Sequence, residues 1–374
     1  MTDILLVVPG PVDLATGGYV YDRRIMAALA ALGHEVETLA LPAGEEARAE
    51  TIRARLHADN APAVGAMLID GLALPGLAPL LADLRRHARC PRLLALVHHP
   101  MALETGLTAE RAAELERQER AALALVDAVV ATSPATAALL TDGGWTRHPV
   151  AVIEPGLSVE AAMPAVPGDD GGADDGGIRL LCVASLTPRK AHQDLVAALS
   201  DLGGAPGGRA WRLDLVGPDT LDAEHAGRVR AAIDAAGLGD RIRCHGVLSG
   251  AALARCYAAA DVFVLPSRFE GYGMAFAEAM AAGLPVVGCA AGAVPDLVPA
   301  SAGILVPPGD VPALAHALGR LIADADLRRQ LAAGAAVAGA ALPRWPDQAR
   351  RLAALAGLSE AGLSEAGLSE EDRS

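Results

Sequence analysis

The sequence predicts an α/β protein of two domains, each built on a doubly wound, Rossmann-like parallel sheet. The length of 374 residues favours two domains. Two sets of short apolar segments alternate with helical segments, as expected of parallel strands that are covered on both faces. A stretch rich in Pro, Gly and Asp separates the two sets.

The first set fills residues 1–160. Its expected strands are ILLVVPG, HEVETLAL, AMLIDGL, LLALVHHP, DAVVATS and VAVIEPG, at 4–10, 34–41, 66–72, 93–100, 127–133 and 150–156. A helix is expected over 21–32, ending at Gly33. Another helix should begin after Ser133, because Ser is a good N-cap and Pro134 suits the first helical position.

Residues 161–177 contain almost no core-forming side chains and are expected to be a linker. The second domain is expected over 178–342, with strands RLLCVAS, WRLDLVG, RIRCHG, DVFVLPS and PVVGC and with helices over 191–202, 223–236 and 251–259. Residues 343–374 should form a C-terminal helix that packs back on the first domain, followed by an acidic tail. The tail repeats AGLSE three times, too few copies for a solenoid, and no catalytic role is expected for it.

Composition excludes several classes of partner. The net charge of −14 argues against a nucleic-acid binder and weakens docking on anionic lipid. The local basic cluster at 85–92 fits charge at a helix C-terminus, with a membrane or partner contact as the alternative. No apolar run reaches the roughly 18 residues of a spanning helix. The N-terminal MTDILLVVPG looks like a strand and not a signal peptide, so a cytoplasmic location is expected.

The five cysteines are scattered and include no CxxC pair. We expect reduced thiols in the core and no zinc site. Asp324-Ala325-Asp326 matches the Asp-x-Asp pattern of metal-dependent sugar transferases, but it falls where one helix ends and another begins. No other acidic pair was identified at a strand end, so no essential metal is expected. The missing GxGxxG fingerprint argues against an NAD(P) enzyme, and no cofactor is expected.

The most specific segment is FEGYGMAFAEAMAAGLPVV, at 269–287. It places Glu270 in a glycine-bearing turn and Glu278 about one turn into a short apolar helix that stops at Gly283. Such a loop offers free backbone N–H groups, a helix N-terminus and two carboxylates. This combination suits a polyol attached to a phosphate, because amides face the anion and carboxylates accept from hydroxyls.

Three further groups are candidates for chemistry. Gly17 and Gly18 precede the first helix, where they let a ligand approach closely or simply form a tight turn. His98 and His99 lie at a strand end, and alternation along the strand lets only one of them point easily into a cleft; a structural role is the alternative.

Arg189 and Lys190 are the third group, at the expected start of a helix. Basic side chains there oppose the helix dipole unless an anion binds. The alternative is a pair of solvated surface charges.

From residue 4 to about 354 the chain resembles glycosyltransferase family 4, the group 1 glycosyltransferases of GT-B architecture. The resemblance rests on GG in the first loop, VHHP, VVATS, VIEPG, TPRKAHQDLVAAL, LVGP, DVFVLPSRFEGYGMAFAEAMAAGLPVVG and GILVPPGD. It implies two Rossmann-like domains that face an interdomain cleft, with the nucleotide-sugar donor held by the second.

The resemblance also implies residue roles. Glu270 would meet hydroxyls of the transferred sugar, and Glu278 would bind the ribose. Diphosphate contacts would come from Arg189, Lys190 and the backbone at Gly271, Gly273, Met274 and Ala275, with Gly17 and Gly18 closing from the other domain. His98 or His99 would sit beside the reacting sugar.

The implied reaction is metal-independent transfer of a hexosyl unit from a nucleoside diphosphate sugar, with UDP favoured, to an acceptor hydroxyl, with retained configuration. A soluble acceptor is expected, and neither its identity nor the oligomeric state is read from the sequence. The family often has Gly-Arg, Lys-Gly and Glu where this chain has Ala184-Ser185, Lys190-Ala191 and Asp296. These departures keep open a catalytically silent relative; a GT-B nucleotide-sugar epimerase is the other alternative.

Overall fold

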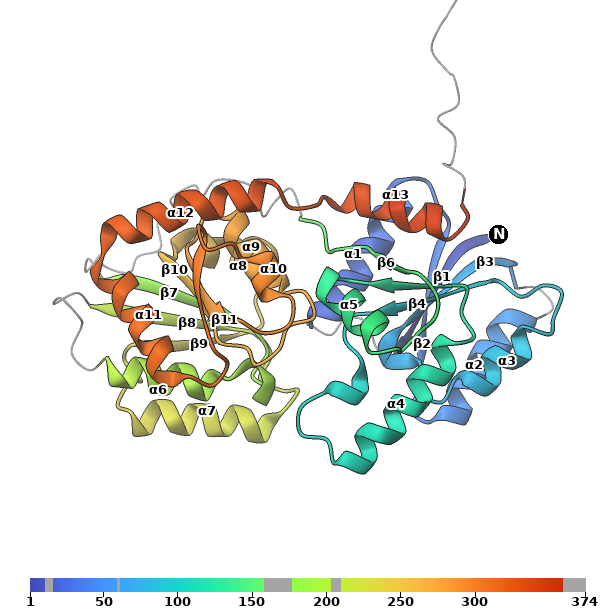
Figure 1. The fold of residues 1–374 in the computed structure, drawn as a ribbon, viewed down its shortest axis with the longest axis horizontal. Helices are drawn as coiled ribbons and strands as arrows, with labels where there is room; N and C mark the ends of the chain where they lie inside the picture. Colours follow the sequence, from blue (N-terminus) through green and yellow to red (C-terminus); the bar gives the residue numbers. More distant parts are fainter. Residues whose placement is uncertain (11–15, 59–60, 158–176, 203–209, 359–374) are drawn as a thin grey trace, which may run out of the picture.

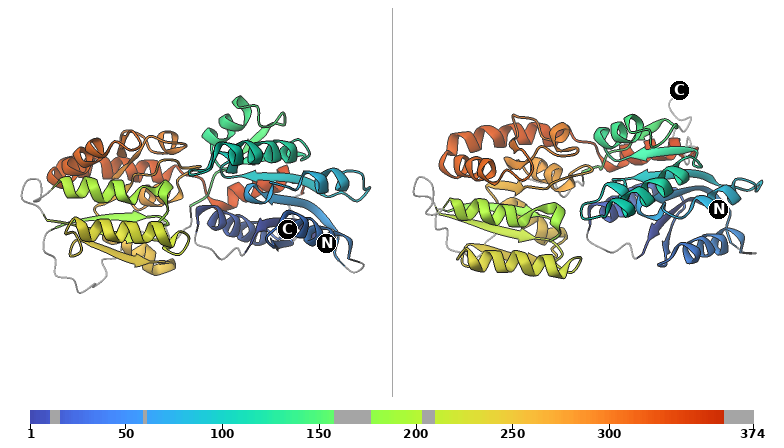
Figure 2. Two further views of the ribbon diagram at one scale, coloured as in Figure 1. Left: turned by 90° about the horizontal axis from the view of Figure 1, so that it is seen from below. Right: turned by 60° about the horizontal axis from the view of Figure 1, so that its bottom comes forward.

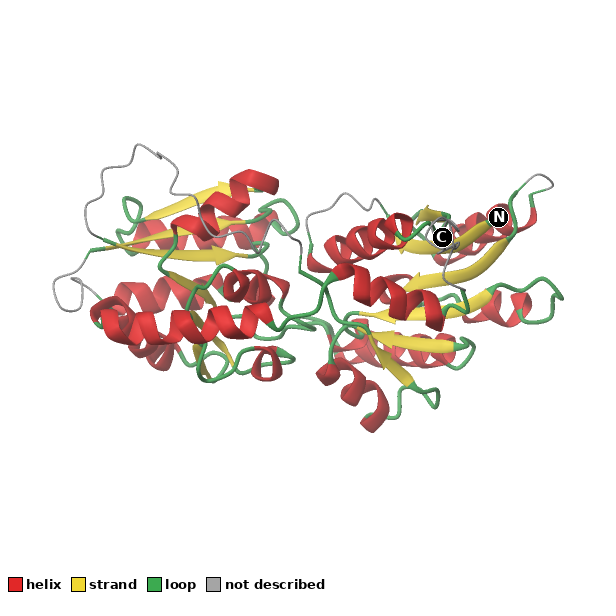
Figure 3. Ribbon diagram, turned by 90° about the horizontal axis from the view of Figure 1, so that it is seen from above, coloured by secondary structure: helices red, strands yellow, loops and turns green. Residues whose placement is uncertain are grey.

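The computed structural model describes residues 1–10, 16–58, 61–157, 177–202 and 210–358. Two lobes lie side by side along the long axis of the molecule (Figure 1) and remain distinct in the other views (Figure 2). Each lobe holds a six-stranded parallel sheet with helices on both faces (Figure 3). The predicted architecture of two doubly wound α/β domains is therefore confirmed.

The first sheet has the order β2-β1-β3-β4-β5-β6. Its strands are β1 (Thr2–Pro9), β2 (Val36–Leu41), β3 (Val64–Asp70), β4 (Arg92–Val97), β5 (Ala128–Ala131) and β6 (Val150–Val152). Side chains of β1 alternate between two cores, with Leu5 and Val7 on one face and Ile4, Leu6 and Val8 on the other. Both faces are therefore buried, which explains the almost purely apolar strand.

Helices cover both faces of this sheet. One face packs against α1 (Gly17–Ala31) and α13 (Trp345–Leu355). The other packs against α2 (Glu45–His57), α3 (Ala78–Leu84), α4 (Ala109–Leu123) and α5 (Pro134–Asp142). Ser133 caps α5 as predicted, because its side chain accepts from the backbone N–H of Thr136. Two short turns, η1 (Gly71–Ala73) and η2 (Met101–Leu103), follow β3 and β4.

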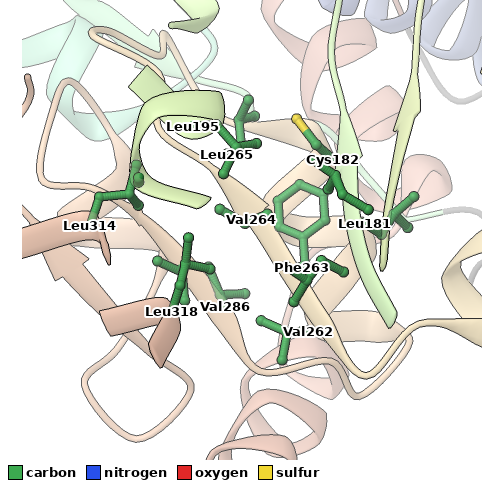
Figure 4. Close-up of a cluster of buried hydrophobic side chains, with 14 of the residues drawn as sticks. Leu181, Cys182, Leu195, Val262, Phe263, Val264, Leu265, Val286, Leu314 and Leu318 are labelled. Atoms are coloured by element: carbon green, nitrogen blue, oxygen red, sulfur yellow. The ribbon is translucent and has the colours of Figure 1, made fainter. Parts of the chain in front are cut away.

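The second sheet has the order β12-β11-β10-β7-β8-β9. Its strands are β7 (Ile178–Val183), β8 (Trp211–Val216), β9 (Ile242–Gly246), β10 (Val262–Leu265), β11 (Val286–Cys289) and β12 (Gly303–Val306). Its turns and helices are η4 (Pro188–Lys190), α6 (His192–Asp201), α7 (Ala223–Ala235), α8 (Gly250–Ala259), α9 (Met274–Ala281), α10 (Val294–Leu297), α11 (Val311–Ala323) and α12 (Ala325–Ala340). Figure 4 shows part of its core, where Leu195 of α6 and Leu314 and Leu318 of α11 approach the strand residues.

Each sheet has a point at which the strand order changes direction. In the first sheet it lies between β1 and β3, and in the second between β7 and β10. The connections that follow such a pair of strands pass to opposite faces of the sheet. A crevice therefore opens beyond the carboxyl ends of the two strands. The segments after β1, β3, β7 and β10 are therefore the places where each domain can bind a ligand.

Several element boundaries differ from the sequence expectations. Helix α1 begins at Gly17, four residues before the predicted start, so both glycines lie in its first turn. Arg189 and Lys190 lie in η4, directly before the N-cap of α6, in agreement with their predicted place where this helix begins. Helix α2 was missed. Asp324 caps α12, in agreement with the helix boundary predicted at the Asp-x-Asp match.

Other expectations have mixed outcomes. No disulfide joins the cysteines, but Cys244 is exposed, which corrects the expectation that all five lie in the core. None of the helices within the described residues is long and apolar enough to cross a membrane. Almost all of the expected linker and most of the AGLSE stretch lie outside the described residues.

The end of the chain returns to the first lobe. Leu157 and Arg344 form a parallel bridge, so the segments that lead out of and back to the N-terminal lobe run side by side. Helix α13 then packs on α1 (Figure 1), with Trp345 meeting Tyr21 edge-on at a centroid distance of 5.4 Å. The core of the first domain therefore depends on residues from the far end of the sequence.

We expect Trp345→Ala to lower the free energy of unfolding by about 3–5 kcal/mol, because it empties a buried aromatic site between α13 and α1. Urea unfolding followed by circular dichroism measures this loss. Val337→Ala on α12 is the control, because Val337 is 74% exposed and should change little. Equal effects of the two substitutions would contradict the docking of α13.

Candidate functional site

A buried ion pair lies at the point where the second sheet changes direction. Lys190, after β7, places its Nζ 2.7 Å from Oε1 of Glu270, after β10. Arg189 donates from Nη1 to the carbonyl of Phe269 at 2.8 Å, and the same Nη1 is 3.8 Å from Oε2 of Glu270. Two cations and one carboxylate therefore meet in one loop cluster, although 80 residues separate them along the chain.

Glu270 is only 6% exposed. Burial by itself would raise the pKa of its carboxyl, but the charges of Lys190 and Arg189 outweigh burial and leave the pKa below the usual value. Glu270 is therefore ionised at neutral pH, and it neutralises only one of the two cations beside it. Within the second domain one cation is therefore in excess, and Glu104 of the first domain lies beside it, with its Oε1 3.4 Å from Nε of Arg189.

The backbone beside Lys190 is strained. Ala191 has φ 53°, a left-handed conformation that glycine adopts without cost, and it is the only such non-glycine residue in the described ranges. A left-handed alanine costs about 1–2 kcal/mol. Strain of this kind persists where the surroundings fix the backbone, and here it lies between Lys190 and the start of α6.

The N-terminus of α9 opens beside Glu270. Gly273 begins the helix with φ 101°, and no side chain caps the amides of the first turn at Met274 and Ala275. Unpaired amides at a helix N-terminus favour an anion. Glu270 directly precedes Gly271, and these amides follow it within the same turn and helix start. The segment predicted to bind the donor therefore holds a carboxylate and free backbone N–H groups close together.

Glu278 lies one turn into α9, as predicted, but apart from the ion pair. It accepts a hydrogen bond from the hydroxyl of Tyr257 in α8 at 2.8 Å. Burial raises the pKa of Glu278, and Tyr257 and Arg24 oppose that rise. With Arg24, Met274 and Trp345, it lines a small cavity of about 40 Å³ between the two lobes.

The first domain contributes a second polar cluster, centred on His98. Its Nε2 lies 3.2 Å from Oδ1 of Asp22 in α1 and 3.6 Å from Oδ2 of Asp70 at the end of β3. Burial acts to lower the pKa of His98, but the two carboxylates overcome it and the pKa is raised. Gly18 packs against this ring, since an added Cβ would lie 3.4 Å from Cδ2 of His98, whereas a Cβ at Gly17 would meet nothing within 4 Å.

The side chains of His98 and His99 lie in different surroundings. The ring of His99 packs on Phe269 of the second domain at a centroid distance of 4.2 Å. Burial lowers the pKa of His99, so this ring is neutral near pH 7. His98, with its raised pKa and its contact with Gly18, is the histidine that the structure associates with the first helix and its glycines.

The two clusters meet at one contact between the domains. An added Cβ at Gly271 would lie 2.2 Å from the carbonyl oxygen of His98, so only glycine allows the loops to approach this closely. Oγ1 of Thr136 donates to the carbonyl of Gly271 at 3.2 Å. Glu104 reaches across to Arg189, with its Oε1 3.4 Å from Nε. The facing groups of the two domains therefore form one site.

Sequence reasoning missed several of these residues. Asp70 directly ends an apolar strand, and Asp22 shares a helical stripe with buried Ile25, Met26 and Leu29. Those two patterns could have identified both carboxylates, which form a pair only through space because Asp22 lies in α1 and Asp70 ends β3. Thr136 and Glu104 gave no such signal, because their partners come from the other domain.

We expect Lys190→Met to cost about 3 kcal/mol of stability at pH 7, because it removes the hydrogen-bonded cation of the buried Glu270 carboxylate and leaves only Arg189, at 3.8 Å. The pKa of Glu270 is lowered in the folded protein, so the pair stabilises above the ordinary glutamate pKa and loses its effect as pH falls through the folded value. The penalty should therefore shrink toward pH 4.

Urea unfolding at both pH values measures this change. Arg329→Met is the control, because Arg329 is a mostly exposed partner of Asp326 on α12. An equal loss at both pH values would show that Lys190 acts through packing and not through charge.

Comparison with known proteins gives the family context. Residues 177–324 match the family model described as glycosyl transferases group 1. The 2-deoxystreptamine N-acetyl-D-glucosaminyltransferase of Streptomyces fradiae is 38% identical over 154 residues, which cover 41% of this chain and 36% of that protein. The D-inositol 3-phosphate glycosyltransferase of Salinispora tropica is 33% identical over 236 residues, covering 58% and 48%. The matches therefore span about half of these relatives or less.

Solved structures match over nearly the whole chain. Sucrose-phosphate synthase from Thermosynechococcus elongatus superposes with a TM-score of 0.79 at 25% identity, covering 95% of this chain and 98% of that one. Anabaena Alr3699/HepE, solved in complex with UDP-glucose, gives 0.76 at 18% identity, covering 96% and 100%. Residues 177–324 thus form a group 1 glycosyltransferase domain, and the chain as a whole has the GT-B fold.

Proposed function

We propose that this protein transfers a hexosyl unit from a nucleoside diphosphate sugar to an acceptor hydroxyl, with retained configuration and without a metal ion. One observation carries the proposal. The anion-binding groups of the second domain, Lys190, Arg189 and the uncapped start of α9, face His98 and Gly18 of the first domain across the Gly271 contact. A phosphate-linked sugar placed there would touch both domains.

The charges in the site suit the departure of a diphosphate. As the bond to the sugar breaks, negative charge grows on the leaving oxygen. Lys190, Arg189 and the amides at Met274 and Ala275 are positioned to stabilise that charge, which is the role a metal ion has in other transferases. The leaving diphosphate can itself accept the acceptor proton when attack occurs on the same face.

Glu270 and Glu278 have separate tasks in this proposal. Glu270 is ionised and held by Lys190, so it can accept hydrogen bonds from hydroxyls of the transferred sugar. Glu278 lies farther along α9, beside Tyr257, where it can accept from a ribose. The cavity beside Glu278 has about 40 Å³, far less than the roughly 300 Å³ or more of a small-molecule site. Donor binding therefore requires the lobes to move apart here, as in a hinge motion.

The fold, the named relatives and the net charge support a choice of donor and acceptor class. UDP is the favoured nucleotide, and Alr3699/HepE, which shares the fold, was solved with UDP-glucose. Two of the relatives are named for small hydroxylated acceptors, 2-deoxystreptamine and D-inositol 3-phosphate. With a net charge of −14, this chain suits such a soluble acceptor better than an anionic lipid surface. These features agree with an enzyme acting in the cytoplasm.

A donor panel followed by a transfer assay tests the proposal. UDP-, GDP- and ADP-sugars are screened by thermal shift, since a ligand at 100 times its Kd stabilises by about 2.7 kcal/mol. The donor that binds is then incubated with cyclitol and aminocyclitol acceptors, and the anomeric configuration of the product is read by NMR. We expect retention, full activity in EDTA, and a loss of about a hundredfold in Lys190→Ala.

Each part of the proposal has an outcome that contradicts it. An absolute Mg²⁺ requirement would contradict the proposed metal independence, and a product of inverted anomeric configuration would contradict the proposed retention. Conversion of the donor sugar without any acceptor would indicate an epimerase. If the donor binds but is neither transferred nor slowly hydrolysed over hours, the protein is catalytically silent. Near-wild-type turnover in Lys190→Ala would contradict the role assigned to Lys190.

We expect Glu104→Gln to tighten UDP binding by up to about fivefold, because Glu104 competes with the diphosphate for Arg189. Isothermal titration calorimetry at low and high salt measures the change, which should shrink at high salt. Glu50→Gln, an exposed carboxylate on α2, is the control. Weaker UDP binding in Glu104→Gln would instead make Glu104 part of the donor site.

A further inference from the structure

The cluster of Asp22, Asp70 and His98 contains two carboxyl groups beside one imidazole, although a single carboxylate is enough to pair with a histidine. Both aspartates are almost fully buried, at 0% and 1% exposed. One oxygen or nitrogen from each residue lies within 4.8 Å of the others. Two carboxylates this close cannot both remain ionised in a buried site without compensation.

Compensating charge around the cluster is scarce. Among the described residues, the two aspartates are the charged groups that act on His98. Tyr19 and Tyr21 of α1 are the neighbouring titratable groups, but both hydroxyls donate to backbone carbonyls, of Pro9 and Ile153. Arg48 lowers the pKa of Tyr19 and Arg351 that of Tyr21, and neither arginine is among the charges that act on the pKa of Asp70.

The two aspartates are not equivalent. Asp22 is closer to the ring, with its Oδ1 3.2 Å from Nε2 of His98. Asp70 is 3.6 Å away, and its other oxygen accepts the backbone N–H of Leu72 at 2.6 Å. Burial, followed by the charge of Asp22, raises the pKa of Asp70. The proton of the pair is therefore best placed on Asp70, and the charge on Asp22.

We propose that Asp22 and Asp70 share one proton, held on Asp70, so that the charge of Asp22 keeps His98 protonated while both aspartates fix the position of its ring. They are positioning residues that act through His98. Nε2 of His98 lies 3.2 Å from Oδ1 of Asp22, where a protonated ring donates, so Nδ1 is the nitrogen left for another partner. A protonated His98 thus offers Nδ1–H as a donor to a substrate oxygen, a use that rests on the proposed function.

A divalent cation is the competing occupant, because two carboxylates and an imidazole nitrogen could also bind one. The observed contacts favour the proton. Nε2 of His98 lies at hydrogen-bonding distance from Asp22, whereas a metal would require that nitrogen to be deprotonated. The experiment below separates the two.

The first test is independent of activity. The full chain is labelled with ¹⁵N-histidine, and His98 is assigned by the loss of its signal in His98→Gln. We expect a His98 pKa above the ordinary histidine value in the wild type. Asp22→Asn should lower it by about one unit or more. Asp70→Asn mimics the protonated acid and should leave the titration nearly unchanged below neutral pH.

The second test uses the pH profile of kcat/KM for transfer. Asp22→Asn should lose about tenfold or more near pH 7, because His98 becomes neutral there. Asp70→Asn should lose clearly less than Asp22→Asn at the same pH, because it retains the hydrogen-bonding shape of the protonated acid and leaves the charge of Asp22 in place. Asp83→Asn on α3, which removes a partly exposed carboxylate of the same domain, is the control. Thermal melts of all variants identify any that fail to fold.

The outcomes are distinct. Equal effects of Asp22→Asn and Asp70→Asn on the His98 titration would overturn the shared proton, as would a wild-type pKa at or below the ordinary value. Stoichiometric binding of Zn²⁺ or Mn²⁺ that is lost in His98→Gln would assign the cluster to a metal instead. If the titrations follow the expectation but no transfer occurs, the cluster proposal stands and the proposed function fails.

Discussion

The buried carboxylate of Glu270 is the constraint on which the site depends. A charge with 6% exposure persists only beside opposite charge, and Lys190 and Arg189 supply it from a loop 80 residues earlier. Their pairing fixes the loops after β7 and β10 relative to one another. Arg189 also donates to the carbonyl of Phe269 and contacts Glu104, so this one cation connects the second domain to the first.

The two domains have clusters of polar groups at equivalent positions in their folds. Each has a buried polar cluster beyond the strands at which its sheet changes direction, with excess cation in the second domain and excess acid in the first. They meet where Gly271 touches the carbonyl of His98. A ligand with a phosphate at one end and hydroxyls at the other therefore finds complementary groups on both sides of a single contact.

Much of this could be predicted from the sequence. The apolar strands, the Ser133 cap and the boundary at Asp324 follow from local rules of periodicity and capping. Glu270 and Glu278 stand out because turn, helix, glycine and proline surround them in a fixed order. Such signals are local, since the residues that determine each element are its own neighbours. Boundaries were less certain where glycine allows two conformations, as at the start of α1.

The sequence by itself therefore determined two doubly wound domains and the turn and helix that carry Glu270 and Glu278, because periodicity and turn chemistry act over a few residues. Tertiary structure decided which charges meet. It paired Lys190 with Glu270 and placed both Asp22 and Asp70 beside the His98 ring. It also gave His98 and His99 different surroundings. These pairings depend on strand order and on contact between domains, which no local pattern encodes.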